Sequence, residues 1–165
     1  MPTTKGRERA VPGVIRVSEG EAARRVTRVS AYAVCVDGED RILLCRIAPG
    51  YTAGFDGWWT LPGGGLDHGE DPRDGALREL TEETGLSGAI EDLLDVDSWH
   101  ELWTNLAGEP EDYHGIRILF RCRIVGGVLR DETDGSTDTC RWFARSELPA
   151  DRLVDIAELA VRLVL

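Results

Sequence analysis

The 165-residue sequence lacks long hydrophobic runs. No stretch approaches the roughly 18 consecutive apolar residues that a membrane-spanning helix needs, and the longest clean runs are short, such as Ala31–Val36. The first 20 residues also contain no apolar segment of the kind found in secretory signal peptides. These absences predict a cytoplasmic protein with no membrane partner.

Basic residues are scarce relative to acidic ones. The chain has 30 aspartates and glutamates against 19 lysines and arginines, which gives a formal net charge of −11. Proteins that bind duplex nucleic acid normally present a basic surface, so we expect no such partner. An anionic small molecule is not excluded, because a bound metal ion can reverse the local sign of an acidic pocket.

Cysteines are few, and their spacing matches no metal or redox motif. The four cysteines, Cys35, Cys45, Cys122 and Cys140, form no C-x-x-C pair and have no zinc-finger spacing with histidine. Three of them lie in apolar, strand-like runs. We therefore expect free, buried thiols in a reducing compartment.

The chain is long enough for one domain with its own core. Residues 1–25 show no sustained periodicity, and we predict a flexible or loosely attached arm there, with a short strand at residues 14–17. Residues 26–165 are predicted to form the folded domain. Apolar residues make up 42% and charged residues 30% of the sequence, a composition typical of globular proteins.

Local patterns predict both strands and helices. Asp71-Pro72 is a strong helix start, and the helical pattern runs to Thr84 and stops at Gly85. A last amphipathic helix is predicted over 151–165. Strand patterns lie at 26–36, 41–47, 58–61, 90–99, 115–125 and 139–144, and the Asp37-Gly38 turn predicts that the first two form a hairpin. This order indicates an α+β fold with a mixed sheet and helices on its faces.

Three carboxylates share one side of the predicted helix. On a helical wheel, Glu79, Glu82 and Glu83 lie opposite the stripe that contains Leu77 and Leu80. If that stripe packs on a sheet, the three acids are presented together, and a hard divalent cation would remove their mutual repulsion. A solvated acidic helix face is the alternative interpretation.

Glycines precede this helix and favour the metal interpretation. Gly63-Gly64-Gly65 allows the backbone to turn tightly and to approach a ligand closely. A fourth acid, Glu70, lies between these glycines and the helix. A glycine-rich turn joined to a helix that carries carboxylates is typical of a site for a metal ion and phosphate groups.

Residues 64–86 resemble the Nudix box. The segment reads GGLDHGEDPRDGALRELTEETGL and matches the pattern Gly, five residues, Glu, seven residues, Arg-Glu-apolar-x-Glu-Glu-x-Gly-apolar. Seven identities at set spacing arise by chance about once in 10⁸ starting positions or more rarely. The fixed positions are filled by Gly64, Glu70, Arg78, Glu79, Glu82, Glu83 and Gly85.

The resemblance implies a Nudix-type α/β/α sandwich that hydrolyses a nucleoside diphosphate linked to another group, with Mg²⁺ or Mn²⁺ as cofactor. By motif position, Glu79, Glu82, Glu83 and the carbonyl of Gly63 are implied metal ligands. Glu79 is also the implied base, and Arg78 is implied to orient the glutamates. A Nudix-fold sensor that binds nucleotides without cleaving them is the alternative. Homodimers are frequent in this family, and a homodimer is left open.

The substrate must be inferred from residues outside the box. Nucleoside triphosphates and nucleotide sugars are favoured, because the residues typical of other Nudix subclasses are absent. Leu102 stands where sequences that resemble ADP-ribose pyrophosphatases have proline, and Trp103 stands where dinucleoside polyphosphate hydrolases often have tyrosine. Aromatic residues that could stack on a base are Tyr51, Phe55, Trp58 and Trp103, although packing in the core would explain them equally well.

Two further contacts are predicted from later in the chain. Arg117, with Arg121 and Arg123, could meet phosphates or pair with surface acids. An additional carboxylate ligand is expected from a later loop, where Asp138 is preferred to the other acids; these are Glu111, Asp112, Asp131, Glu132 and Asp134.

Overall fold

The computed structural model describes residues 23–51, 54–105 and 107–165. The predicted strand at 14–17 and nearly all of the predicted arm lie outside these residues. The first described strand, β1, is Arg24–Cys35.

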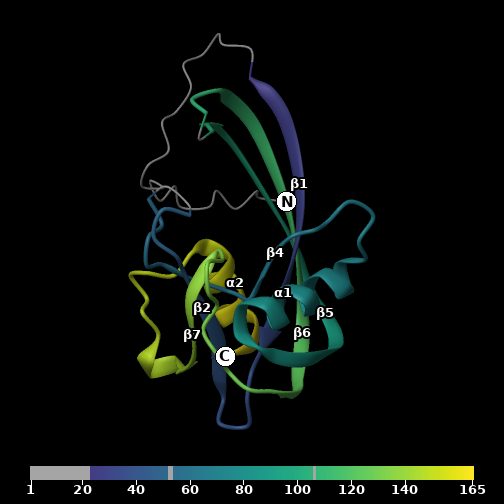
Figure 1. The fold of residues 1–165 in the computed structure, drawn as a ribbon, viewed down its shortest axis with the longest axis vertical. Coiled ribbons are helices and arrows are strands. Elements are labelled where there is room, and N and C mark those ends of the chain that lie inside the picture. Colours follow the sequence, from purple (N-terminus) through teal and green to yellow (C-terminus); the bar gives the residue numbers. More distant parts are fainter. Residues whose placement is uncertain (1–22, 52–53, 106) are drawn as a thin grey trace, which may run out of the picture.

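Two sheets form the frame of the molecule (Figure 1). The larger sheet has the order β4-β1-β6-β5, and the smaller has the order β3-β2-β7. β1 is parallel to β6, whereas β4 and β5 pair antiparallel to their neighbours, so the larger sheet is mixed as predicted. The other strands are β2 (Arg41–Ile47), β3 (Trp59–Thr60), β4 (Gly63–Gly65), β5 (Leu86–Thr104), β6 (Pro110–Gly127) and β7 (Thr137–Ala144).

The predicted hairpin between β1 and β2 is wrong. The turn exists, and the Asp37 carboxylate accepts hydrogen bonds from the backbone amides of Glu39 and Arg41. However, β1 and β2 share only the isolated bridge between Val36 and Ile42. A strand has two edges, and β1 uses one for β4 and the other for β6. β2 therefore enters the second sheet.

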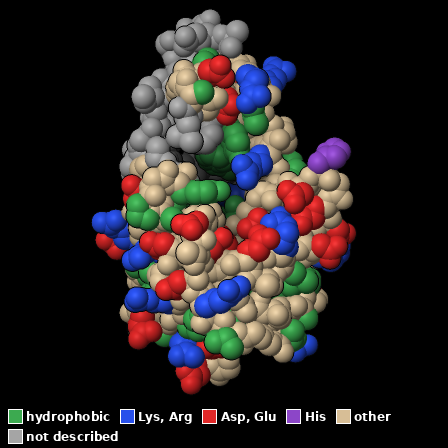
Figure 2. Space-filling model, viewed as in Figure 1, with side chains coloured by type: hydrophobic (Ala, Val, Ile, Leu, Met, Phe, Trp, Pro, Cys, Tyr) green, Lys and Arg blue, Asp and Glu red, His purple; other side chains and the backbone are tan. Residues whose placement is uncertain are grey.

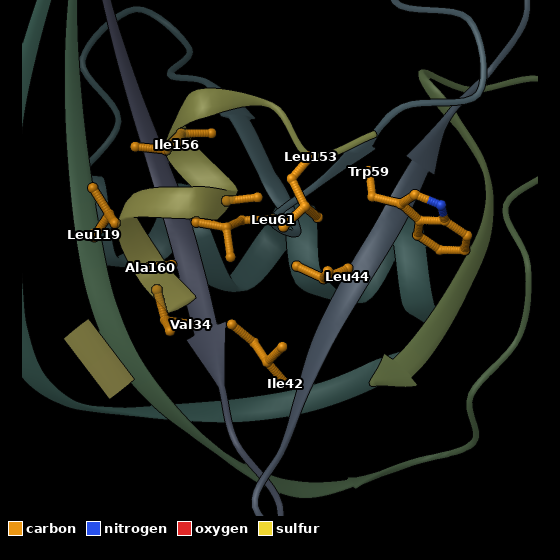
Figure 3. Close-up of a cluster of buried hydrophobic side chains, with 10 residues drawn as sticks. Val34, Ile42, Leu44, Trp59, Leu61, Leu119, Leu153, Ile156 and Ala160 are labelled. Carbon is orange, nitrogen blue, oxygen red and sulfur yellow. The ribbon is translucent and has the colours of Figure 1, made fainter. Parts of the chain in front are cut away.

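The two helices cover opposite faces of β1. α1 (Pro72–Thr84) packs on the face that contains Ala31, since this alanine shares a buried cluster with Ala76 of the helix. α2 (Asp155–Val164) packs on the other face, where Val34 shares a buried cluster with Ile156 and Ala160 and lies beside Ala160 (Figure 3). Successive side chains of a strand point to opposite sides, so this arrangement is the predicted sandwich. Within the described ranges, no helix is long and apolar enough to cross a membrane.

The prediction of four free thiols is wrong for one pair. Cys45 and Cys140 form a disulfide, while Cys35 and Cys122 are free and buried. The sheet register explains the pairing, because Cys45 of β2 lies directly opposite Cys140 of β7. Positions 95 residues apart become neighbours only when these two strands pair.

Candidate active site

The ends of α1 follow the sequence signals and fix where its side chains point. Asp71 caps the helix by accepting a hydrogen bond from the amide of Arg73 at 2.8 Å, and Pro72 occupies the first helical position. Gly85 ends the helix with φ of 71°, a left-handed conformation that favours glycine. Both predicted ends are confirmed.

Glu83 is buried against the glycine turn. Only 2% of the residue is exposed. Its carboxylate accepts hydrogen bonds from the amide of Gly63 and from the hydroxyl of Ser136, each at 3.0 Å. Burial raises the pKa of Glu83 to about 8, although both hydrogen bonds oppose the rise. Glu83 is therefore not part of a solvated helix face, because β4 and the segment before β7 cover its side of the helix.

Glu79 lies at the same turn. A Cβ atom added to Gly64 would be only 3.0 Å from Oε1 of Glu79, so the absence of a side chain at Gly64 makes room for this carboxylate. Burial raises the pKa of Glu79, and hydrogen bonding to Arg78 partly offsets the rise. Two carboxylates thus adjoin consecutive glycines, while the side chain of Glu82 is 53% exposed.

Arg78 connects the box loop to the glutamates. Its Nε and Nη2 atoms donate to the two carboxylate oxygens of Glu70, at 2.8 and 2.9 Å. Nη1 donates to Glu79 at 2.9 Å and to Glu82 at 3.0 Å. Hydrogen bonding to Arg78 lowers the pKa of Glu70 to about 2. Figure 2 shows acidic and basic side chains close together on the face over α1.

A fifth carboxylate, Glu132, lies near the cluster from the loop before β7. Its negative charge contributes to the raised pKa of both Glu79 and Glu83. It accepts hydrogen bonds from the amide and hydroxyl of Thr137, at 3.3 and 3.0 Å. The residue preferred from the sequence, Asp138, instead forms a two-point ion pair with Arg46, at 2.8 and 3.1 Å. Sequence alone could not choose between these acids, because the path of the loop before β7 places Glu132 and the register of β7 places Asp138.

Ser136 is a residue of the site that the sequence alone does not indicate. Its hydroxyl is one of two donors to the buried carboxylate of Glu83. No local motif marks this serine, because the contact joins residues 53 positions apart.

The donor chemistry of the cluster suits a hard divalent cation. Among the described residues, no three histidine, cysteine, aspartate or glutamate side chains stand together in a geometry that could already hold a metal ion. Mg²⁺ prefers oxygen ligands and is usually held by one or two carboxylates together with substrate phosphates. The pair of carboxylates at Gly63 and Gly64 meets that requirement, and the repulsion among these acids favours a bound cation.

The predicted substrate residues are not all brought together. Phe55 and Trp58 pack edge to face with ring centroids 5.3 Å apart. Tyr51 is 58% exposed. Arg117 forms ion pairs with Asp97 of β5 and Asp155 of α2. Of its two predicted roles, it therefore has the pairing with acids. The side chain of Trp103 lies outside the described part of the structure.

Comparison with known proteins agrees with the fold and the box. The NUDIX domain model matches residues 26–163, and the chain belongs to the NUDIX family. A MutT-like protein of Streptomyces ambofaciens is 31% identical over 137 residues, which cover 82% of this chain and 74% of that protein. Human 8-oxo-dGDP phosphatase NUDT18 is 29% identical over 79% of this chain, which spans only 38% of the human protein.

Solved structures show the same architecture. The MutT NUDIX hydrolase from Burkholderia pseudomallei superposes with a TM-score of 0.62 at 27% identity, and the match covers 85% of this chain and 99% of that one. A NUDIX hydrolase from Nitrosomonas europaea gives a TM-score of 0.64 at 25% identity, covering 83% and 87% of the two chains. The predicted Nudix-type fold is confirmed.

Proposed function

We propose that this chain is a metal-dependent pyrophosphohydrolase that cleaves the pyrophosphate linkage of a nucleoside diphosphate derivative. The observation that carries the proposal is the buried carboxylate of Glu83, held by Gly63 and Ser136 beside Glu79. A buried carboxylate with other acids around it is costly unless a cation accompanies it. The complete box supports the same conclusion.

Glu79, Glu82 and Glu83 are proposed to hold Mg²⁺ or Mn²⁺, with the carbonyl of Gly63. Glu132 is better placed than Asp138 as the further acid. When bound, such an ion neutralises diphosphate charge and lowers the pKa of a coordinated water. Glu79 is proposed as the base that takes the proton from the attacking water. Arg78 positions Glu79 and Glu82 through its hydrogen bonds.

Nucleoside triphosphates and nucleotide sugars are the proposed substrate classes. Relatives are named for hydrolysis of other phosphorylated nucleotide compounds: an 8-oxo-dGDP phosphatase, an RNA pyrophosphohydrolase of Cereibacter sphaeroides that is 35% identical over 101 residues, and an ADP-ribose pyrophosphatase. All three names denote hydrolysis of a phosphate or pyrophosphate linkage, and the compounds that carry this linkage differ. The names therefore support the reaction class and do not select one substrate.

A panel assay tests the proposal. Purified protein is incubated with nucleoside triphosphates, nucleoside diphosphates, nucleotide sugars and ADP-ribose, with Mg²⁺, Mn²⁺ or EDTA. We expect phosphate, pyrophosphate or a nucleoside monophosphate to be released from at least one class, and only when metal is present. Nucleotide binding without product from any compound would favour the non-catalytic sensor and overturn the proposal.

A further inference from the structure

We propose that Arg28 of β1 binds a phosphate group of the substrate, in a groove beside the glycine turn. This inference rests on the proposed function and deepens it, because Arg28 lies outside the box. It assigns a role in substrate affinity to a residue that neither the box nor the aromatic pattern singles out.

The groove exists because β4 is short. β4 pairs only with Ser30–Tyr32 of β1, so the edge of β1 from Arg24 to Val29 is not covered by that strand. The chain then turns away through residues 66–70. A hollow of about 370 Å³ remains between Thr27–Val29 and Leu66–Glu70, with Arg28 in its lining.

Arg28 packs directly on the last glycine of the turn. A Cβ atom added to Gly65 would lie 2.6 Å from Nε and 2.8 Å from Cζ of Arg28, closer than real side chains approach. Gly64 makes the matching approach to Glu79. Successive residues of a strand point to opposite sides, so Glu79 and Arg28 flank the edge strand β4 from its two faces. A substrate that reaches across this edge would meet the carboxylates on one face and the guanidinium on the other.

The charge of Arg28 is not taken up by an acid. In the described part of the chain, no carboxylate forms an ion pair with it, whereas neighbouring Arg24 and Arg25 pair with Glu111 and Asp112. Arg117 is likewise bound by two aspartates. The chain has a net charge of −11, so an arginine that has no acid partner near the acidic cluster is a suitable site for a phosphate group. Phosphate oxygens accept two parallel hydrogen bonds from one guanidinium.

A larger hollow elsewhere does not offer the same chemistry. It has a volume of about 580 Å³ and lies between Val36–Gly38 and Trp142, with Arg123 in its lining. Arg123 donates to Glu91 at 3.0 Å, and no member of the carboxylate cluster lines this hollow. The groove at Arg28 is therefore the better candidate for the phosphate chain.

Steady-state kinetics on the full chain test the proposal with a nucleoside triphosphate that the wild type hydrolyses. Arg28→Ala is expected to raise KM roughly ten- to hundred-fold and to change kcat less than about three-fold. Arg28→Lys should give an intermediate KM, because lysine keeps the positive charge but cannot form the two parallel hydrogen bonds of a guanidinium. Arg25→Ala is the matched control, since it removes an exposed arginine of the same strand, and its KM should equal that of the wild type. Equal KM for Arg28→Ala and wild type would overturn the proposal.

A binding measurement separates this proposal from the proposed function. Calorimetric titration with a methylene-bridged, non-hydrolysable ATP analogue and Mg²⁺ is expected to give a Kd at least ten-fold weaker for Arg28→Ala than for wild type. That result stands even if no compound is cleaved, in which case only the hydrolase assignment fails. Melting temperatures of both proteins show whether the variant is folded. A second variant, Gly65→Ala, displaces the guanidinium of Arg28 and keeps its charge. This variant should also weaken binding of the analogue. Equal Kd values in folded proteins would reject the role of Arg28.

Discussion

At the scale of single residues, burial separates Glu83 from Glu82. Both occupy fixed positions of the box, yet Glu83 is enclosed by Gly63 and Ser136 while the side chain of Glu82 is about half exposed. The helical wheel placed both opposite the apolar stripe, and it could not show that a second layer covers one of them. The two residues therefore allow different tests, one of stability and one of turnover.

Glu82→Gln is expected to reduce kcat by about 100-fold or more and to leave the melting temperature nearly unchanged. The carboxylate is about half exposed, and its side-chain partner among the described residues is Arg78, whereas the proposed metal centre needs its negative charge. Metal-dependent steady-state assays and thermal melts measure the two effects. Glu109→Gln, in an exposed turn away from the site, serves as the control. Activity close to wild type in Glu82→Gln would contradict the assignment.

Glu83 is expected to make the stability of the metal-free protein depend on pH. Its pKa is about 8 in the folded chain against an ordinary value of 4.5. Between these values the folded state holds a proton that the unfolded state releases, so stability falls as pH rises from about 4.5 to 8. In EDTA, Glu83→Gln should show a smaller loss of melting temperature from pH 5 to pH 8 than wild type. Parallel pH profiles for the two proteins would refute this.

At the scale of elements, α1 was predicted from local signals and the strand pairings were not. Its capping aspartate, first-turn proline and final glycine act within a few residues, so the sequence contains all the information needed for its ends. The partner of β1 and the choice between Glu132 and Asp138 depend on contacts across dozens of residues. Local patterns find strands, but only sheet register places their side chains.

Gly85→Ala is expected to destabilise the protein by about 1–3 kcal/mol. The position has φ of 71°, and a Cβ atom there would lie 2.6 Å from Cγ of Arg130 and 2.7 Å from the carbonyl oxygen of Val128. Denaturant unfolding measures the change. Gly38→Ala is the control, because nothing lies within 4 Å of its added Cβ and its φ is not positive. Equal losses in the two variants would show that the helix end is not strained.

The loop before β7 can be tested with two matched variants. Glu132→Gln should lower kcat at least about ten-fold if this acid serves the metal centre. Asp138→Asn should leave kcat near wild type, because Asp138 is already paired with Arg46. Both substitutions remove one negative charge and conserve size. The reverse order of effects would restore Asp138 as the further ligand.

At the scale of the whole molecule, the disulfide joins two strands of the smaller sheet. Cys45 and Cys140 are 95 residues apart in the chain, so the bond closes a long loop and restricts the unfolded state. Cys140 also lies against α1, since its Sγ is 3.3 Å from the carbonyl oxygen of Glu83. The smaller sheet thus supports the helix that carries the proposed metal ligands.

Reduction is expected to lower the stability of the wild type by about 2–4 kcal/mol. Dithiothreitol should therefore lower its melting temperature, and a double variant with Cys45→Ala and Cys140→Ala should not respond. Thiol titration of the denatured, unreduced protein should count two free thiols, from Cys35 and Cys122. Four reactive thiols would contradict the disulfide.

The sequence by itself determined the family, the fold class and the bounds of α1, because the box and the capping residues act over short, regular spacings. Only the tertiary structure decided that β1 and β2 separate, that Glu83 is enclosed and that Arg28 meets Gly65. Each of these depends on which strand edges pair and which layers cover them. Those choices follow from packing of the whole chain, and no local pattern of residues encodes them.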